Sequence, residues 1–239
     1  MINKIVISVA GKGTRMGDLT KDIPKPLLKV KGKPFLYYLL ENIKKAGFSE
    51  IIVVTGYKSE KVEKFLKDYD SSIQTVNQFE KLGEEKYGTV CPILSAKDLI
   101  GNEDFVSVNG DNLYSPEDLQ SFRIEDDYCC VAGLESENPE LYGVLNIEGD
   151  FVTKIIEKPK EFYGNLVNIN LFKFTTDIFE AINKVGKSER GEYEITDAVN
   201  ILAKEKKVKV KNLKDYWKDF GKPEDIEKLE EFMKKEYNL

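Results

Sequence analysis

A glycine-rich turn directly after a short apolar run is the feature that most constrains how this chain can fold. The run Ile5–Ile7 has the length and β-branched composition of a buried parallel strand. Gly11 and Gly13 follow it, and because neither carries a Cβ, the backbone can turn sharply and come close to a ligand. The inward-pointing amides of such a turn form a nest suited to a phosphate. The glycines alone are equally compatible with an ordinary strand-to-helix turn.

Two cations beside this turn favour a polyphosphate site. Arg15 carries a planar fork of donors that fits phosphate oxygens. Lys25 lies between Pro24 and Pro26, and a proline disfavours the helical region for the residue before it. We therefore expect an extended backbone around Lys25, which would present its amine as a positioned cation.

The composition excludes several classes of function. The 239 residues suit one large α/β domain better than two small ones. The 36 Lys and Arg against 42 Asp and Glu give a net charge of −6. A nucleic-acid binder usually shows a basic excess, which is missing here. The absence of histidine excludes Ser-His and Cys-His catalysis and every His-containing metal site.

The cysteines and the hydropathy pattern point to a cytoplasmic protein. Three cysteines without metal-ligand spacing suggest a reducing compartment. The N-terminus lacks a signal-peptide pattern, and no apolar run approaches the length of a membrane span. We therefore expect partners other than nucleic acids or membranes.

Strands and helices alternate in the first half of the chain. The expected elements are helices from Phe35 to about Ala46, across Val62–Leu66 and from Gly88 to Leu99, and strands at Ile51–Thr55, Ile73–Val76 and Phe105–Val108. This alternation is typical of a parallel sheet covered on both faces. Ligands of such sheets bind beyond the carboxyl ends of the strands, where the glycine turn falls.

The second half is expected to add strands and further helices. Ser115 begins a helix with capping-box-like spacing. Tyr128–Leu134 forms a strand in which Cys129 and Cys130 are packed. Residues 142–156 form a hairpin around Glu148-Gly149-Asp150. The last helix, about Glu224–Tyr237, has one apolar side and should dock on the domain or on another subunit of a homo-oligomer.

The stretch Val9–Leu28 resembles the signature of the sugar-1-phosphate nucleotidylyltransferases, G-x-G-T-R-[LM], then Leu-Thr, then P-K-P-L-L. The matching residues are Gly11, Gly13, Thr14, Arg15, Met16, Leu19, Thr20, Pro24, Lys25, Pro26, Leu27 and Leu28. Val9 stands where the family often has Ala, and Gly17-Asp18 replaces a polar-proline pair. The family's Gly-Asp, E-K-P and W-x-D-x-G elements follow in order at residues 110–111, 157–159 and 217–221.

This resemblance implies a fold and a domain organisation. The fold is a three-layer α/β/α sandwich with a mixed, mostly parallel Rossmann-like central sheet. Residues 1–239 form a single nucleotidyltransferase domain, with a nucleotide-binding half at about 1–112 and a sugar-phosphate-binding half at about 113–239. No hexapeptide repeat follows, so the left-handed β-helix acyltransferase domain of some relatives is expected to be missing.

The resemblance also assigns site residues. It makes Arg15 and Lys25 catalytic; Ala10, Gly11, Gly13, Thr14, Gln78, Gly88 and Thr89 nucleotide-binding; Gly143, Glu157, Lys158 and Asn168 sugar-phosphate-binding; and Asp111 and Asp219 metal ligands. From the residues alone, a solvated turn is the favoured interpretation of an Asp at a strand end, and only the resemblance makes Asp111 a metal ligand. Gln74 and Asn77 compete with Gln78 for the base.

Two further segments of the family pattern leave questions open. Asn170 replaces the family's Gly in V-N-x-G, which leaves the identity of the sugar open. Glu194 and Asp197 lie at a helix start, where we interpret them as capping and bracing residues.

The implied reaction joins a nucleoside triphosphate, with UTP or dTTP favoured, to a sugar 1-phosphate, and releases pyrophosphate. The nucleophile is a phosphate oxygen that is ionised at neutral pH, so the reaction requires no general base. Two anions must meet, and catalysis therefore depends on positioning and charge neutralisation. An oxygen-only site with two carboxylates suits Mg²⁺.

Three other interpretations are compatible with parts of the sequence. A cytidylyltransferase would use the same chemistry on phosphocholine or another small phosphoalcohol. A non-catalytic nucleotide-binding regulatory homologue should have lost a charged site residue, and none is lost. A dinucleotide-dependent dehydrogenase is disfavoured because Met16 occupies the last glycine position of G-x-G-x-x-G.

Overall fold

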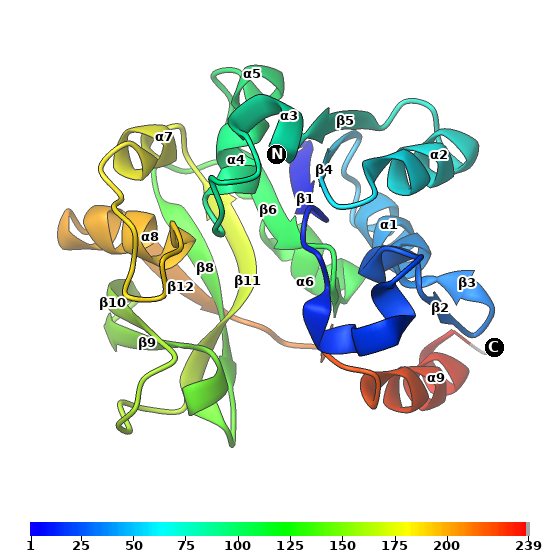
Figure 1. Cartoon of the computed structure of the whole chain (residues 1–239). Coiled ribbons are helices and arrows are strands. Elements are labelled where there is room, and N and C mark those ends of the chain that lie inside the picture. The colour runs from blue at the N-terminus through cyan, green and yellow to red at the C-terminus, as the bar shows by residue number, and fades with distance from the viewer. Residues whose placement is uncertain (238–239) are drawn as a thin grey trace.

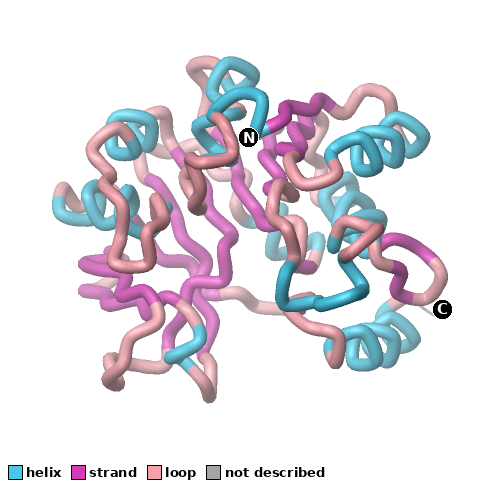
Figure 2. The backbone as a smooth tube through the Cα atoms, in the orientation of Figure 1, coloured by secondary structure: helices cyan, strands magenta, loops and turns pink. Residues whose placement is uncertain are grey.

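A nine-stranded sheet runs through the computed structural model of the protein, which describes residues 1–237 (Figures 1 and 2). In spatial order its strands are β5 (Gln74–Asn77), β4 (Glu50–Thr55), β1 (Lys4–Ser8), β6 (Phe105–Asn109), β11 (Leu166–Phe174), β8 (Cys129–Glu135), β12 (Val208–Asn212), β10 (Phe151–Glu157) and β9 (Gly143–Glu148). All of these strands except β10 and β11 run in the same direction. The predicted mixed sheet is confirmed.

Helices cover both faces of this sheet. They are α1 (Phe35–Lys45), α2 (Ser59–Tyr69), α3 (Gln78–Leu82), α4 (Cys91–Ser95), α5 (Lys97–Ile100), α6 (Pro116–Ser121), α7 (Asp177–Ile182), α8 (Ile195–Lys204) and α9 (Asp225–Glu236). Side chains of α1, α2, α6 and α9 pack into one core, and those of α4, α5, α7 and α8 pack into a second core.

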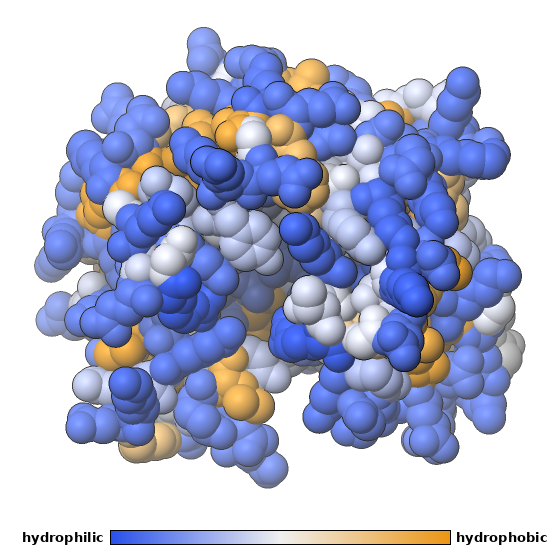
Figure 3. Space-filling view, viewed as in Figure 1, coloured by the Kyte–Doolittle hydropathy of each residue, from blue (hydrophilic) through white to orange (hydrophobic). Residues whose placement is uncertain are grey.

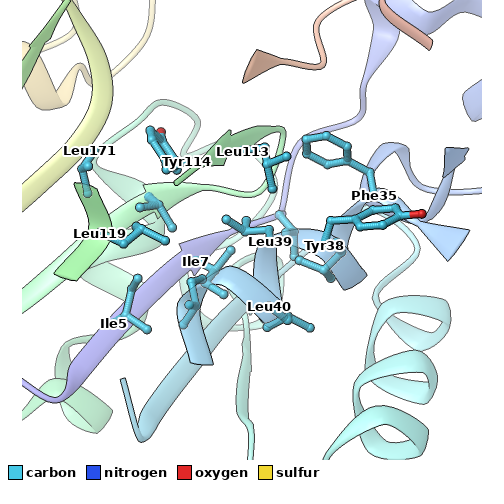
Figure 4. Packing of buried hydrophobic residues seen from close by; sticks show 14 of the residues in the cluster. Ile5, Ile7, Phe35, Tyr38, Leu39, Leu40, Leu113, Tyr114, Leu119 and Leu171 are labelled. Carbon is cyan, nitrogen blue, oxygen red and sulfur yellow. The ribbon is translucent and has the colours of Figure 1, made fainter. Parts of the chain in front are cut away.

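Alternation along the strands supplies both cores. Ile5 and Ile7 of β1 point into the first core and Val6 points into the second, as the period of two in a strand requires. Leu39 and Leu40 of α1 lie over β1 in the first core (Figure 4). The three-layer α/β/α sandwich is therefore confirmed.

Most predicted elements lie within a residue or two of their expected bounds, but the helix expected at Gly88–Leu99 is wrong. Gly88 has a φ of +139°, and the structure places α4 only at Cys91. A Cβ on Gly88 would lie 2.3 Å from the Tyr193 carbonyl oxygen, which accepts a hydrogen bond from Val90 N–H at 3.1 Å. This pairing with a distant segment keeps residues 88–90 out of a helix, and Ala96 then separates α4 from α5.

The C-terminal segment returns to the first half of the molecule. In Figure 1 it crosses from β12 to α9, which lies beside β2 (Lys29–Val30) and β3 (Lys33–Pro34). Leu229 and Met233 of α9 are buried in the first core, so the apolar side of the last helix docks on its own domain. No helix within residues 1–237 is long and apolar enough to cross a membrane.

Candidate functional site

Two adjoining pockets open beside the carboxyl ends of β1 and β6, and every residue assigned from the sequence lines one of them. The first, of about 280 Å³, contains the glycine turn and is here called the loop pocket. The second, of about 350 Å³, contains residues of β9 and β10 and is here called the hairpin pocket. In Figure 3 the hydrophilic surface is hollowed near the middle of this face.

The assigned residues divide between the two pockets. The loop pocket is lined by Ala10, Gly11, Gly13, Thr14, Lys25, Gln78 and Gly88. The hairpin pocket is lined by Gly143, Glu157, Lys158, Asn168 and Asp219. Arg15, Thr89 and Asp111 line both, so they lie at the boundary where two ligands would meet.

The glycine turn closes tightly at Gly13. Gly13 has a φ of +64°, in the left-handed region that favours glycine. A Cβ there would lie 3.0 Å from Lys25 Cβ and 3.1 Å from Thr20 Cγ2. A Cβ on Gly11 would meet nothing within 4 Å. Gly13 therefore allows the turn to pack on Lys25, whereas Gly11 leaves open space above the backbone.

Lys25 is positioned by an ion pair and not by an extended backbone. The predicted extended conformation is wrong, because Lys25–Leu27 forms a 3₁₀ turn in which Leu27 N–H donates to the Pro24 carbonyl at 2.8 Å. The side chain of Lys25 is buried, and its Nζ lies 2.6 Å from Asp111 Oδ2. These tertiary contacts overcome the local preference of a residue that precedes a proline.

A small two-stranded sheet brings the two aspartates together. Asp111 follows β6, and the next residues form β7 (Asn112–Tyr114), which pairs with β13 (Trp217–Asp219) so that Asp219 lies opposite Asn112. Phe220 N–H donates to the Asp111 carbonyl at 2.8 Å. Both aspartates line the hairpin pocket, together with Arg15.

The two carboxyl groups have opposite pKa shifts. Burial by itself would raise the pKa of Asp111, but the charge of Lys25 and hydrogen bonds from Lys25 and Asn112 hold it below its usual value. Burial and then the negative charge of Asp111 raise the pKa of Asp219 to about 6, against the opposing charges of Lys25 and Arg15. The positive charges near Asp219 are thus too weak to offset its burial and the charge of Asp111.

This donor set fits a magnesium ion. Among residues 1–237, no three His, Cys, Asp or Glu side chains gather as a metal-binding group, so the protein would supply a pair of carboxylates. Mg²⁺ is commonly held by one or two carboxylates, with water and substrate phosphates completing its shell. A divalent cation beside Asp219 would also compensate the repulsion that raises the pKa of this side chain.

The hairpin pocket places an acid next to cations. Gly143 is buried, and a Cβ on it would lie 3.0 Å from Ile155 Cγ2 and 3.1 Å from Glu157 Oε2, so the glycine leaves room for both side chains. Burial and then the charge of Glu194 raise the pKa of Glu157. Lys158 is exposed, and its backbone N–H donates to the Tyr142 carbonyl at 2.9 Å. The pocket therefore offers both an acceptor for hydroxyl groups and a cation for a phosphate.

Sequence reasoning missed Arg190, which enters the hairpin pocket from the loop before α8. Its guanidinium lies 3.1 Å from Glu192 and Glu194 and 3.4 Å from Glu157. The signal in the sequence was the rarity of arginine. The chain has three arginines, and one of the other two, Arg15, was already assigned to the site. Tyr87 and Glu192 were also missed, and both line the two pockets.

The cap expected from Glu194 is provided by another residue. Thr89 Oγ1 accepts a hydrogen bond from Ile195 N–H at 2.7 Å and thereby caps α8. Glu194 makes no such bond and instead pairs with Arg190. The Thr89 hydroxyl is thus used to fix α8 beside the pockets.

The structure separates the three candidates for base recognition. Gln74 is exposed, and the side chain of Asn77 caps α3 by accepting from Phe79 N–H at 2.9 Å. Gln78 is buried in the wall of the loop pocket, and its Oε1 has no hydrogen-bond partner within the described part of the chain. A buried acceptor without a partner is costly, so Gln78 has the properties of a ligand-binding residue.

Comparison with known proteins identifies the family. The sequence profile described as Nucleotidyl transferase matches residues 4–236. The chain belongs to the nucleotidyl transferase family. This confirms the resemblance that its motifs indicated, and the glycine turn is that of this family.

The relatives include both sequences and solved structures. The chain is 38% identical over 222 residues to the bifunctional protein GlmU of Methanocaldococcus jannaschii, covering 92% of this chain and 52% of that protein. It is 36% identical over 225 residues to a bifunctional sugar-1-phosphate nucleotidylyltransferase/acetyltransferase of Sulfurisphaera tokodaii, covering 93% and 53%. The chain spans about half the length of these curated relatives.

A solved structure shares the fold over nearly the whole chain. The crystal structure of a UDP-glucose pyrophosphorylase complexed with UDP-glucose matches with a TM-score of 0.85 at 28% identity, covering 98% of this chain and 99% of that one. The nucleotide-diphospho-sugar transferase-like fold is therefore confirmed.

One departure from the family pattern has a local explanation. Asn170 stands where the family has Gly, and its φ is +59°. Asn tolerates this left-handed conformation better than other residues that carry a Cβ. The backbone of this chain can therefore keep the conformation that a glycine would adopt.

Proposed function

We propose that this chain transfers a nucleotidyl group from a nucleoside triphosphate to a sugar 1-phosphate. A phosphate oxygen of the sugar 1-phosphate attacks the α-phosphorus, and the bond from that phosphorus to the β-phosphate bridging oxygen breaks to release pyrophosphate. The observation that carries this proposal is the convergence of Arg15, Lys25, Asp111 and Asp219 where the two pockets meet.

The loop pocket suits the triphosphate. Its glycine turn offers a close approach to backbone amides, and Arg15 and Lys25 add charge for the phosphates. The unpaired Oε1 of Gln78 suits the N3–H donor that uracil and thymine present and cytosine lacks. We therefore propose UTP or dTTP as the donor.

The hairpin pocket suits the sugar phosphate. Lys158 and Arg190 supply positive charge for the phosphate, and Glu157 can accept hydrogen bonds from sugar hydroxyls. Arg190 is already paired with acidic side chains, so it is oriented before a ligand arrives. The name of the Sulfurisphaera relative, a sugar-1-phosphate nucleotidylyltransferase/acetyltransferase, supports this class of acceptor.

Asp111 and Asp219 would hold Mg²⁺ at the boundary of the pockets. The bound ion would neutralise phosphate charge and help to align the two substrates. The protein's own contribution is positional, because Arg15 and Lys25 hold phosphate oxygens while Lys158 and Arg190 hold the acceptor. An ionised phosphate needs no proton removed, which agrees with the absence of histidine.

A matrix of donors and acceptors tests this proposal. Pyrophosphate release would be measured for UTP, dTTP, CTP, ATP and GTP with glucose 1-phosphate, N-acetylglucosamine 1-phosphate or phosphocholine, with Mg²⁺ and with EDTA. We expect turnover with UTP or dTTP and a sugar 1-phosphate, abolished by EDTA. Turnover confined to CTP with phosphocholine would support the cytidylyltransferase alternative. Nucleotide binding without any turnover would support a regulatory homologue.

A further inference from the structure

Asn170 holds an unusual backbone conformation inside a strand. Its φ is +59°, and its N–H donates to Asn168 Oδ1 at 2.9 Å. The pairing of β11 with β8 shifts register between Asn168 and Phe172, as at a bulge. Bulges of this kind redirect side chains and occur often next to binding sites. A residue with a Cβ in this region indicates a reason to keep its side chain.

Asn170 also lies at the wall of the hairpin pocket. Asn170 lines this pocket together with Gly143, Glu157 and Asn168, and it is partly buried. Within residues 1–237, no hydrogen bond is formed by its side-chain amide, whereas that of Asn168 already accepts from the Asn170 backbone. One amide at the wall of a polar pocket is thus available to a ligand as both donor and acceptor.

We propose that Asn170 selects the sugar, so that the pocket prefers a hexose 1-phosphate with free hydroxyls over one with an N-acyl substituent. This inference rests on the proposed function. The amide provides a hydrogen bond to a ring hydroxyl, which a glycine cannot offer. Its bulk also takes up space that a glycine would leave for an acetamido group.

Both contributions are large enough to measure. A hydrogen bond to a sugar hydroxyl is worth about 0.5–1.5 kcal/mol, or roughly a few-fold to tenfold in kcat/KM. The loss or gain of a small group in a fitted pocket changes discrimination by roughly 10–200-fold. We therefore expect Asn170 to account for at least about a tenfold preference.

Two variants separate the amide from its bulk. Asn170→Gly tolerates the positive φ and removes the side chain, whereas Asn170→Asp tolerates the same backbone and keeps the bulk without the amide donor. The probes are glucose 1-phosphate and N-acetylglucosamine 1-phosphate, assayed with the donor that the wild-type protein uses. The thermal midpoint of each variant shows that the fold is retained.

The expected result is a change in the ratio of kcat/KM for the two acceptors. The wild-type protein should favour glucose 1-phosphate. Asn170→Gly should reduce that preference at least about tenfold, through a higher KM for glucose 1-phosphate and a lower one for N-acetylglucosamine 1-phosphate. Asn170→Asp should bind both acceptors more weakly and still disfavour the acetamido sugar.

The outcomes that would overturn this inference differ from those that would overturn the proposed function. An unchanged ratio in Asn170→Gly, or a wild-type preference for N-acetylglucosamine 1-phosphate, contradicts the role of Asn170 while the proposed reaction stands. Absence of turnover by the wild-type protein with every acceptor overturns the proposed reaction and this inference with it.

Discussion

The loop pocket and the hairpin pocket hold their charged groups in different ways. In the loop pocket the cation Lys25 is buried and fixed to Asp111, and tightly packed glycines determine the shape of the wall. In the hairpin pocket Lys158 and Arg190 are more exposed than Lys25, and Arg190 shares its charge among three glutamates.

This difference indicates different roles for the two pockets in the proposed reaction. A fixed buried cation loses little entropy on meeting a phosphate, which is the requirement for stabilising a transition state. An exposed arginine whose charge is shared among several carboxylates contributes mainly to capture of a ligand. The loop pocket should therefore control the rate of the chemical step, and the hairpin pocket the affinity and choice of the acceptor.

The largest expected effect tests this division directly. Arg15→Ala and Lys25→Ala should each lower kcat by about 10²–10³-fold, because each removes a positive charge at the site of reaction. Arg190→Ala should mainly raise the KM of the sugar 1-phosphate, by about tenfold. Steady-state kinetics on the three variants provides the measurement, with Lys21→Ala, an exposed lysine of the same loop region, as the control. An equal loss of kcat in Arg190→Ala would remove the distinction between the pockets.

At the boundary between the pockets, the ionised side chain of Asp219 should destabilise the fold of the metal-free protein. Its pKa is raised from 3.8 to about 6, so the folded protein binds this proton more tightly than the unfolded chain does. The free energy of unfolding of the metal-free protein should therefore fall as pH rises from about 4 to about 6 and then stay level. Asp219→Asn should recover up to about 3 kcal/mol at pH 7 while activity is lost.

Denaturant unfolding across this pH range, in EDTA, provides the test. The difference between the wild-type and Asp219→Asn curves reports on Asp219 and on Asp111, whose charge is coupled to it, since the two proteins share the more distant titrations. Asp127→Asn is a matched control at an exposed position. If Asp219→Asn were less stable than the wild-type protein at pH 7, the raised pKa of this carboxyl group would be contradicted.

Sequence patterns predicted the structure correctly where it depends on residues that are neighbours in the chain. The strands β1, β4 and β6 follow from short apolar runs, and the sharp turn at Gly13 follows from the spacing of the glycines. Because parallel strands deliver their carboxyl ends to one edge, these local features also located the loop pocket. The hairpin pocket followed only from the family's motifs, since its walls come from segments far apart in the chain.

The errors lie where a distant contact overrides a local preference. Lys25 forms a 3₁₀ turn instead of an extended segment because its amine pairs with Asp111, 86 residues away. Thr89, 106 residues before Ile195 in the sequence, caps α8 through the Ile195 N–H, and Glu194 pairs with Arg190 instead of capping the helix. Neither pairing has a local signature, because only the assembled sheet brings these residues together.

The third prediction compares a glycine in each pocket. Gly13→Ala should lower the free energy of unfolding by about 1–2 kcal/mol, because it places a Cβ at a positive φ. The contact of this Cβ with Lys25 adds to that cost. Gly143→Ala has no such backbone penalty, but its Cβ would press on Glu157, so it should raise the KM of the acceptor with a smaller loss of stability. Thermal unfolding and acceptor kinetics on both variants provide the measurement. A larger loss of stability in Gly143→Ala than in Gly13→Ala would contradict this comparison.

The smallest expected effect concerns the competition between Lys25 and a divalent metal ion for Asp111. In the absence of metal, Lys25 supplies the positive charge beside Asp111, so it opposes binding of a divalent cation there. Lys25→Met should therefore bind Mn²⁺ more tightly than the wild-type protein in the absence of nucleotide, on the order of tenfold, although its activity falls. Electron paramagnetic resonance titration of free Mn²⁺ measures this, with Lys21→Met as the control. Weaker Mn²⁺ binding by Lys25→Met would show that the lysine supports the metal site, and the loop pocket would then be organised around the ion and not around the buried ion pair.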